Sequence, residues 1–201
     1  MNKKPQYGFS LYELMITVLI VGVVLSLGIP NMREFSQNSR MTATANDFHS
    51  AFHLARSEAS RAKTNITICA SADSMSGAPS CGGTWDQGYI VFVDTDGNIA
   101  TGGVGESILR AQPAMPDGIS LAVANNADFF SFAATGLGRG NVDGNTALSQ
   151  VVMCDERGNV IAAGGSSAAR LFVATPLGRA TIQREKSLIE GALSSMGATC
   201  P

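Results

Sequence analysis

The sequence GFSLYELMITVLIVGVVLSLGIP, residues 8–30, decides how this chain folds. No charged side chain occurs from Leu14 to Ile29, and the two hydroxyl side chains in that run, Thr17 and Ser26, can donate to carbonyl oxygens of their own helix. With the residues just before it included, the run approaches the roughly 20 residues that a helix needs to cross a bilayer. The stretch therefore predicts a membrane-spanning helix.

Glu13 is the one acidic residue in this apolar helix. Inserting a carboxylate into a bilayer costs about 2.5–3.5 kcal/mol even on lenient insertion scales. Such a residue therefore usually pairs with another group and has a function. The plainer alternative is that Glu13 lies at the membrane surface of an ordinary single-span anchor.

A short basic leader precedes the apolar helix and carries Lys3 and Lys4. Basic residues favour the cytoplasmic side, which places this end inside and the long remainder outside. The apolar run continues through Pro30 without an A-x-A pattern, so it differs from a secretory signal that is removed whole. We expect a leader at residues 1–8 and a retained membrane helix at residues 9–30.

The motif GFSLYE at residues 8–13, followed by a long apolar helix, resembles the class III signal of type IV pilins and type II secretion pseudopilins. The resemblance implies that a prepilin peptidase cuts after Gly8 and methylates the new amino terminus at Phe9. It also implies a single-pass protein of the inner membrane with a periplasmic head, which then enters a pilus at the cell surface.

Glu13 gains a role from this resemblance. Once the leader is removed, the amine of Phe9 is largely cationic at neutral pH. The resemblance implies that Glu13 pairs with this amine on a neighbouring subunit and so helps to recruit and register subunits. The implied partners are other minor and major pilins, contacted through the N-terminal helix.

The helix is expected to continue over residues 31–65 as an amphipathic extension. Pro30 removes one hydrogen bond, which predicts a kink or an interruption at the junction rather than the end of the helix. Apolar side chains then alternate at spacings of four and three, which places them on one face. They are Met41, Ala45, Phe48, Phe52, Ala55, Ala59 and Ala62.

After residue 65 the pattern changes to short β-strands separated by Gly, Asp, Asn and Pro. Such spacing favours antiparallel sheets over βαβ units. The sequence therefore predicts an α+β fold, in which a long N-terminal transmembrane and amphipathic helix packs on an antiparallel β-sheet head at residues 66–201. The expected strands are 66–69, 88–93, 107–109, 119–123, 129–132, 151–154, 171–174 and 181–183.

The four cysteines are Cys69, Cys81, Cys154 and Cys200. An even number outside the cytoplasm favours disulfides, and no CxxC spacing points to zinc or redox chemistry. Of the three possible connectivities we favour Cys69–Cys81 with Cys154–Cys200. Free buried thiols are the alternative.

Two patterns were candidates for metal ligands. His49 and His53 have a helical spacing that can hold zinc, but no third ligand is evident. The segment DTDGN, residues 94–98, alternates three oxygen side chains, yet it lacks the glycine and glutamate positions of an EF-hand loop, so a turn is favoured. We expect no metal, no cofactor and no catalytic constellation, hence no enzyme.

Four further motifs lie in the head, namely CGGTWDQGYIVFVD at 81–94, FSF at 130–132 running into Gly136, CDERG at 154–158 and TPLGR at 175–179. Together they resemble the GspH/FimT family of minor pilins and pseudopilins. The cysteines and the tryptophan-containing stretch at 81–94 are more similar to the FimU/FimT pilus branch than to the secretion branch.

The subtype decides the function that this resemblance implies. FimU-like proteins prime pilus assembly at or near the tip, whereas FimT-like proteins bind DNA through a C-terminal Gly-Arg-x-Arg motif. Here Thr181 stands where the second arginine would be, and the candidate DNA-binding residues are Arg179, Arg184 and Lys186. Two or three phosphate contacts give only weak, salt-sensitive binding. In an extended strand Arg179 and Arg184 would also point to opposite faces.

The sequence therefore predicts a minor pilin that takes part in the priming or tip complex of a type IV pilus. The alternatives are a DNA-binding minor pilin for natural transformation and a minor pseudopilin of type II secretion. The net charge of −2 becomes −4 when Lys3 and Lys4 leave with the leader, so no global positive field attracts DNA.

Overall fold

A computed structural model gives the structure, which describes residues 8–162 and 164–200. The leader residues before Gly8, with Lys3 and Lys4, lie outside the described residues. The chain forms two compact units, residues 1–37 and residues 38–201.

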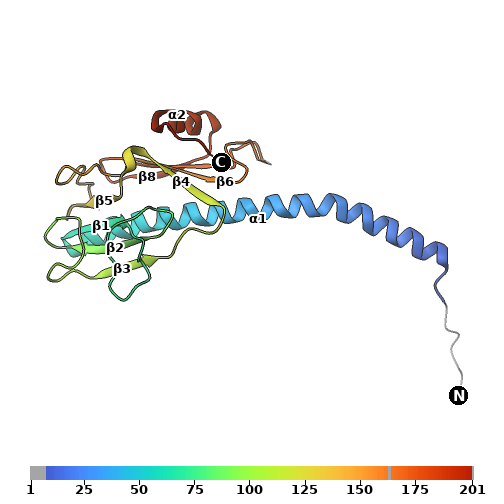
Figure 1. Ribbon diagram of the computed structural model, residues 1–201, viewed down its shortest axis with the longest axis horizontal. Coiled ribbons are helices and arrows are strands. Elements are labelled where there is room, and N and C mark those ends of the chain that lie inside the picture. The colour runs from blue at the N-terminus through green and yellow to red at the C-terminus, as the bar shows by residue number, and fades with distance from the viewer. Residues whose placement is uncertain (1–7, 163, 201) are drawn as a thin grey trace, which may run out of the picture. The chain divides into compact units, whose positions relative to one another are not determined.

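One helix, α1, Leu11–Ala62, belongs to both units (Figure 1). The helix continues through residue 30, in agreement with the expectation that Pro30 would not end it. It stops three residues before the expected position, because Lys63 takes a left-handed backbone conformation with φ of 56°, which is typical of the residue that follows a helix.

In the part of the chain that the structure describes, eight strands follow and form two four-stranded antiparallel sheets, and all eight correspond to strands expected from the sequence. The first sheet has the order β3-β2-β1-β5 and the second β4-β6-β7-β8. The α+β fold with a long N-terminal helix is thereby confirmed. The strands are β1 Asn65–Ala70, β2 Tyr89–Asp94, β3 Ile108–Gln112, β4 Ile119–Val123, β5 Phe129–Phe132, β6 Gln150–Asp155, β7 Arg170–Ala174 and β8 Ala180–Gln183.

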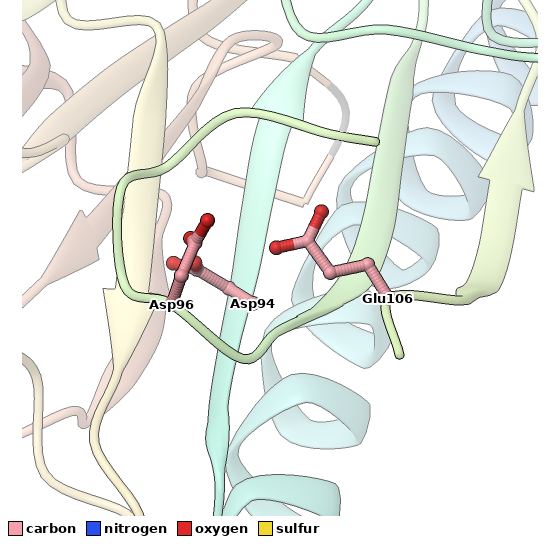
Figure 2. A group of neighbouring side chains, drawn as sticks. All are labelled: Asp94, Asp96 and Glu106. Carbon is pink, nitrogen blue, oxygen red and sulfur yellow. The ribbon is translucent and has the colours of Figure 1, made fainter. Parts of the chain in front are cut away.

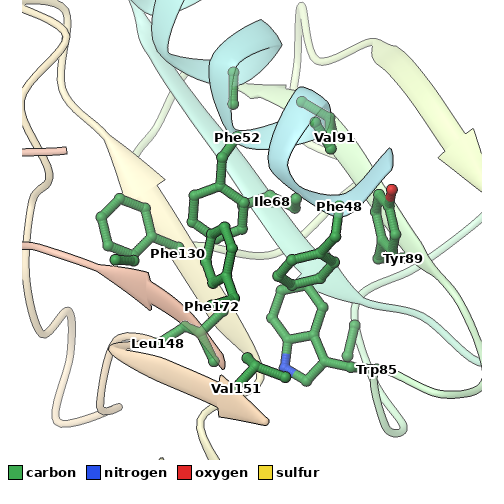
Figure 3. Close-up of a cluster of buried hydrophobic side chains, with 14 of the residues drawn as sticks. Phe48, Phe52, Ile68, Trp85, Tyr89, Val91, Phe130, Leu148, Val151 and Phe172 are labelled. Carbon is green, nitrogen blue, oxygen red and sulfur yellow. The ribbon is translucent and has the colours of Figure 1, made fainter. Parts of the chain in front are cut away.

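The second half of α1 supplies the centre of the hydrophobic core. Phe48 is fully buried, and its ring lies 5.3 Å from that of Trp85, 5.5 Å from that of Tyr89 and 4.9 Å from that of Phe172 (Figure 3). Tyr89 belongs to the first sheet and Phe172 to the second, so one side chain of α1 contacts both sheets. The apolar face expected from Met41 to Ala62 is buried as far as Ala59. Ala62, the last residue of α1, is exposed.

The second sheet is covered on both faces. Because neighbouring side chains of a strand point to opposite faces, Val151 and Met153 of β6 join the core around α1, whereas Val152 and Cys154 face a second cluster. That cluster is closed by Ile189 and other side chains of α2, Lys186–Met196.

The sequence analysis did not predict α2. Its buried side chains are few, namely Ile189, Ala192 and Leu193. The helix ends at Gly197, whose φ of 63° is left-handed, and the N–H of Ala198 donates to the carbonyl of Leu193 at 3.0 Å.

Two disulfides close the head and match the favoured pairing. Cys69 of β1 bonds Cys81 across 12 residues, and Cys154 of β6 bonds Cys200 across 46 residues. The second bond ties the segment after α2 to the strand beneath it. In the loop-entropy model bridges of these spans stabilise the fold by about 3 and about 4 kcal/mol.

We predict that Phe48→Ala lowers the free energy of unfolding of the head by about 3–5 kcal/mol, because it opens a cavity between the helix and both sheets. Phe35→Ala is the matched control, since Phe35 lies on the same helix with 70% of its side chain exposed. The control is expected to change the same free energy by less than about 0.5 kcal/mol. Denaturant unfolding of the full-length protein in detergent, followed by the emission of the single tryptophan, Trp85, measures both. If both variants lowered the free energy of unfolding equally, Phe48 would not be the central side chain of the core.

Candidate functional site

The start of α1 has a well-formed N-terminal cap. The hydroxyl of Ser10 accepts a hydrogen bond from the N–H of Glu13 at 3.2 Å, and the carbonyl of Ser10 accepts one from the N–H of Leu14 at 3.2 Å. Glu13 is therefore the third residue of the helix, where a carboxylate also interacts favourably with the positive end of the helix dipole. This cap was not expected from the sequence, although the S-x-x-E spacing that marks it is present at residues 10–13.

Gly8 and Phe9 precede the cap and are exposed. A Cβ built on Gly8 would meet no atom of the described residues within 4 Å. Phe9 as a whole residue is 74% exposed. No contact in the described part of the chain thus explains why residue 8 is glycine.

The first half of α1 presents an apolar surface that none of the described residues covers. It is the one described helix long and apolar enough to cross a membrane, and none of its most hydrophobic 18-residue window is buried. The hydroxyls of Thr17 and Ser26 donate to the carbonyls of Leu14 and Val23 at 2.8 Å, as the sequence indicated. A surface of this kind requires lipid or other protein around it.

His49 and His53 lie on the second half of α1, with their Nε2 atoms 3.3 Å apart. Nε2 of His49 also lies 3.0 Å from the carbonyl oxygen of Ala180 in β8. Burial, followed by the charges of His49 and Arg56, lowers the pKa of His53. No acid, cysteine or third histidine joins the pair as a metal ligand among residues 8–162 and 164–200.

The candidate DNA-binding residues lie on both sides of β8. Arg179 precedes the strand in the turn that begins at Thr175, whose hydroxyl accepts the N–H of Arg179 at 3.2 Å. Arg184 follows the strand, so the two backbones are roughly 16 Å apart at about 3.3 Å per residue. Lys186 begins α2 and pairs with Glu190 at 3.6 Å. The structure does not bring Arg179 together with the other two.

A further cation of this region, Arg170, is buried and serves the fold. Its Nη1 donates to the carbonyls of Ser167, Ala168 and Ala169 at 2.7, 2.8 and 3.0 Å. Burial, and next the charge of Arg184, lower its pKa to about 10. Its guanidinium is therefore not available to a phosphate at the surface.

Comparison with known proteins places these features in a family. The family model described as "Type II transport protein GspH" matches residues 44–177. No curated protein matches the chain.

Two crystal structures of the type IV minor pilin FimU from Pseudomonas aeruginosa PAO1 also align with this chain. The form in space group P21 is 16% identical with a TM-score of 0.48, and covers 76% of this chain and 94% of that one. The form in space group P65 is 17% identical with a TM-score of 0.46, and covers 73% and 94%.

The family match spans about two thirds of the chain, from the second half of α1 to the turn before β8. The matched residues include the stretches at 81–94, 130–132 and 154–158, which carry the resemblance in the sequence. The chain therefore belongs to the GspH/FimT family of type IV pilin-like proteins.

Proposed function

We propose that this protein is a minor pilin that takes part in the assembly of a type IV pilus, within a priming or tip complex. The observation that carries the proposal is the uncovered apolar surface of the first half of α1, directly behind the Gly8–Phe9 junction. Lipid of the inner membrane covers this surface before assembly, with the head in the periplasm. Apolar helices of other pilins cover it in the filament at the cell surface.

We propose that recognition by a prepilin peptidase explains why residue 8 is glycine, since no close contact among the described residues requires glycine at this position. The enzyme reads Gly8 as part of its recognition sequence. Cleavage after Gly8 leaves Phe9 as the new, methylated amino terminus, two residues before α1 begins.

Glu13 has two possible roles at this helix end, and both draw on its position. As the third residue of α1 it favours the local cap, which needs no partner. As a carboxylate within an apolar surface it can also neutralise the amine of Phe9 on a neighbouring subunit. We propose the second role, because a cap at this position can be completed by an uncharged glutamine.

The positions of the candidate DNA-binding residues support DNA capture less well than the apolar surface of α1 supports pilus assembly. Arg179 is separated by β8 from Arg184, and Lys186 is already paired with Glu190. A duplex would therefore meet isolated cations rather than a groove that neutralises several phosphates.

A minor pseudopilin of type II secretion is the second candidate function. The observation that favours it is the matched family model, whose description names type II transport. The apolar surface of α1 and the role of Glu13 would be the same in that assembly, so these features do not separate the two candidates.

We predict that Glu13→Gln enters the membrane normally but is incorporated into pili at least about tenfold less than the wild type. An amine left without its carboxylate in an apolar interface costs about 2–5 kcal/mol. Immunodetection of the protein in membranes and in sheared pili measures both steps. Ser10→Ala is the control, because it removes the cap and keeps the charge. Equal defects in the two variants would assign Glu13 to the cap, and wild-type incorporation of Glu13→Gln would refute the pairing.

We predict that deletion of the gene reduces the number of surface pili and leaves the secretion of extracellular enzymes unchanged. The two processes are measured separately in the same strain by electron microscopy and by enzyme activity in the culture medium. Complementation with the wild-type gene controls for effects on neighbouring genes. Normal piliation together with lost secretion would favour the pseudopilin.

A further inference from the structure

Three carboxylates converge at the loop that joins β2 to β3. Asp94 is the last residue of β2, Asp96 follows two residues later, and Glu106 approaches from the far end of the loop (Figure 2). One oxygen of each carboxylate lies within 4.8 Å of the others. The sequence analysis expected a turn at residues 94–98 and did not connect it with Glu106.

Two oxygens of this cluster are buried without a hydrogen bond. Oδ1 of Asp94 and Oε1 of Glu106 accept no hydrogen bond from any described residue, and the side chain of Asp94 is 0% exposed. A buried acceptor left unsatisfied destabilises the fold, and the penalty is larger when the group is charged. These oxygens point to a positively charged ligand.

The same two carboxylates are oriented by their other oxygens. Oδ2 of Asp94 accepts the hydroxyl of Thr67 at 2.7 Å and Nη1 of Arg139 at 3.3 Å. Oε2 of Glu106 accepts the N–H of Gly103 at 2.7 Å. Asp94 and Glu106 are thus each held by one oxygen, while the second is left for another partner. Asp96 differs, because its Oδ1 accepts the N–H of Asn98 at 3.1 Å and its Oδ2 accepts the side-chain amide of Asn98 at 2.8 Å.

The charge of the cluster fits a divalent cation. Asp94, Asp96 and Glu106 are opposed by one guanidinium, that of Arg139, so the formal charges leave two negative charges uncompensated. A monovalent ion would neutralise half of that charge. One divalent ion would neutralise all of it.

We propose that Asp94, Asp96 and Glu106 bind a calcium ion. All three ligands are carboxylate oxygens, which suit calcium or magnesium rather than zinc or copper. Two ligands of one Ca²⁺ at 2.3–2.6 Å can lie up to about 5 Å apart, and Ca²⁺ tolerates irregular geometry, whereas Mg²⁺ demands a near-ideal octahedron. The ion would tie the end of β2 to the residues just before β3. This proposal is independent of the role in pilus assembly.

Three protein ligands are fewer than the six to eight oxygens that Ca²⁺ takes, so water completes the shell. The expected dissociation constant is therefore that of extracellular calcium modules, about 10⁻⁴–10⁻³ M.

The test is calorimetric titration of the full-length protein in detergent with CaCl₂, after treatment with EDTA. Asp96→Asn and Glu106→Gln are each expected to weaken binding at least about tenfold, because the affinity depends on the number of charged ligands. Asp94 is left unchanged, because its second oxygen also holds Thr67 and Arg139. Asp143→Asn, an exposed acid in a different loop, is the control and should bind like the wild type.

Thermal unfolding gives a second readout that does not depend on heats of binding. Calcium should raise the melting temperature of the wild type and of Asp143→Asn, but not that of Glu106→Gln. In EDTA the wild type and Glu106→Gln should melt at similar temperatures, which shows that the variant folds. The proposal is overturned if the wild type binds no Ca²⁺ at millimolar concentrations, if Asp96→Asn and Glu106→Gln bind like the wild type, or if Mg²⁺ binds as tightly as Ca²⁺.

Discussion

The apolar surface of α1 has to be covered along the whole helix, and the two halves of the helix meet this requirement differently. The second half is covered by the chain itself, with Phe48 in contact with side chains from both sheets. The first half is not covered by any of the described residues, and it is long and apolar enough to cross a membrane. A single continuous helix thus combines the core of a folded head with a surface that requires lipid or other subunits.

The head is built around this helix in layers. One face of the second sheet, with Val151 and Met153, packs on α1, and the other face, with Val152 and Cys154, packs beneath α2. The Cys154–Cys200 bond then fixes the chain after α2 to the middle layer. Because side chains alternate along β6, this one strand contributes to the core around α1 and to the cluster beneath α2.

The sequence predicted the parts of this structure that depend on local periodicity. The apolar stripe of α1 and all eight strands have clear helical or strand patterns, so their positions could be read from the chain. The helix α2 was missed because only Ile189, Ala192 and Leu193 mark its buried face. Glu106 was missed for another reason: its approach to Asp94 depends on the path of a long loop, which no short motif encodes. The separation of Arg179 from Arg184 likewise follows from where β8 begins and ends.

The central claim is that the leader is removed after Gly8 and that the apolar half of α1 is retained as the contact surface for lipid and other subunits. Mass spectrometry of the amino-terminal peptide of the protein purified from cells tests this claim most directly. The account predicts a peptide that begins at Phe9, carries one methyl group on its amine and continues into the apolar helix. A mature protein that begins at Met1, or at any residue beyond Pro30, would contradict it.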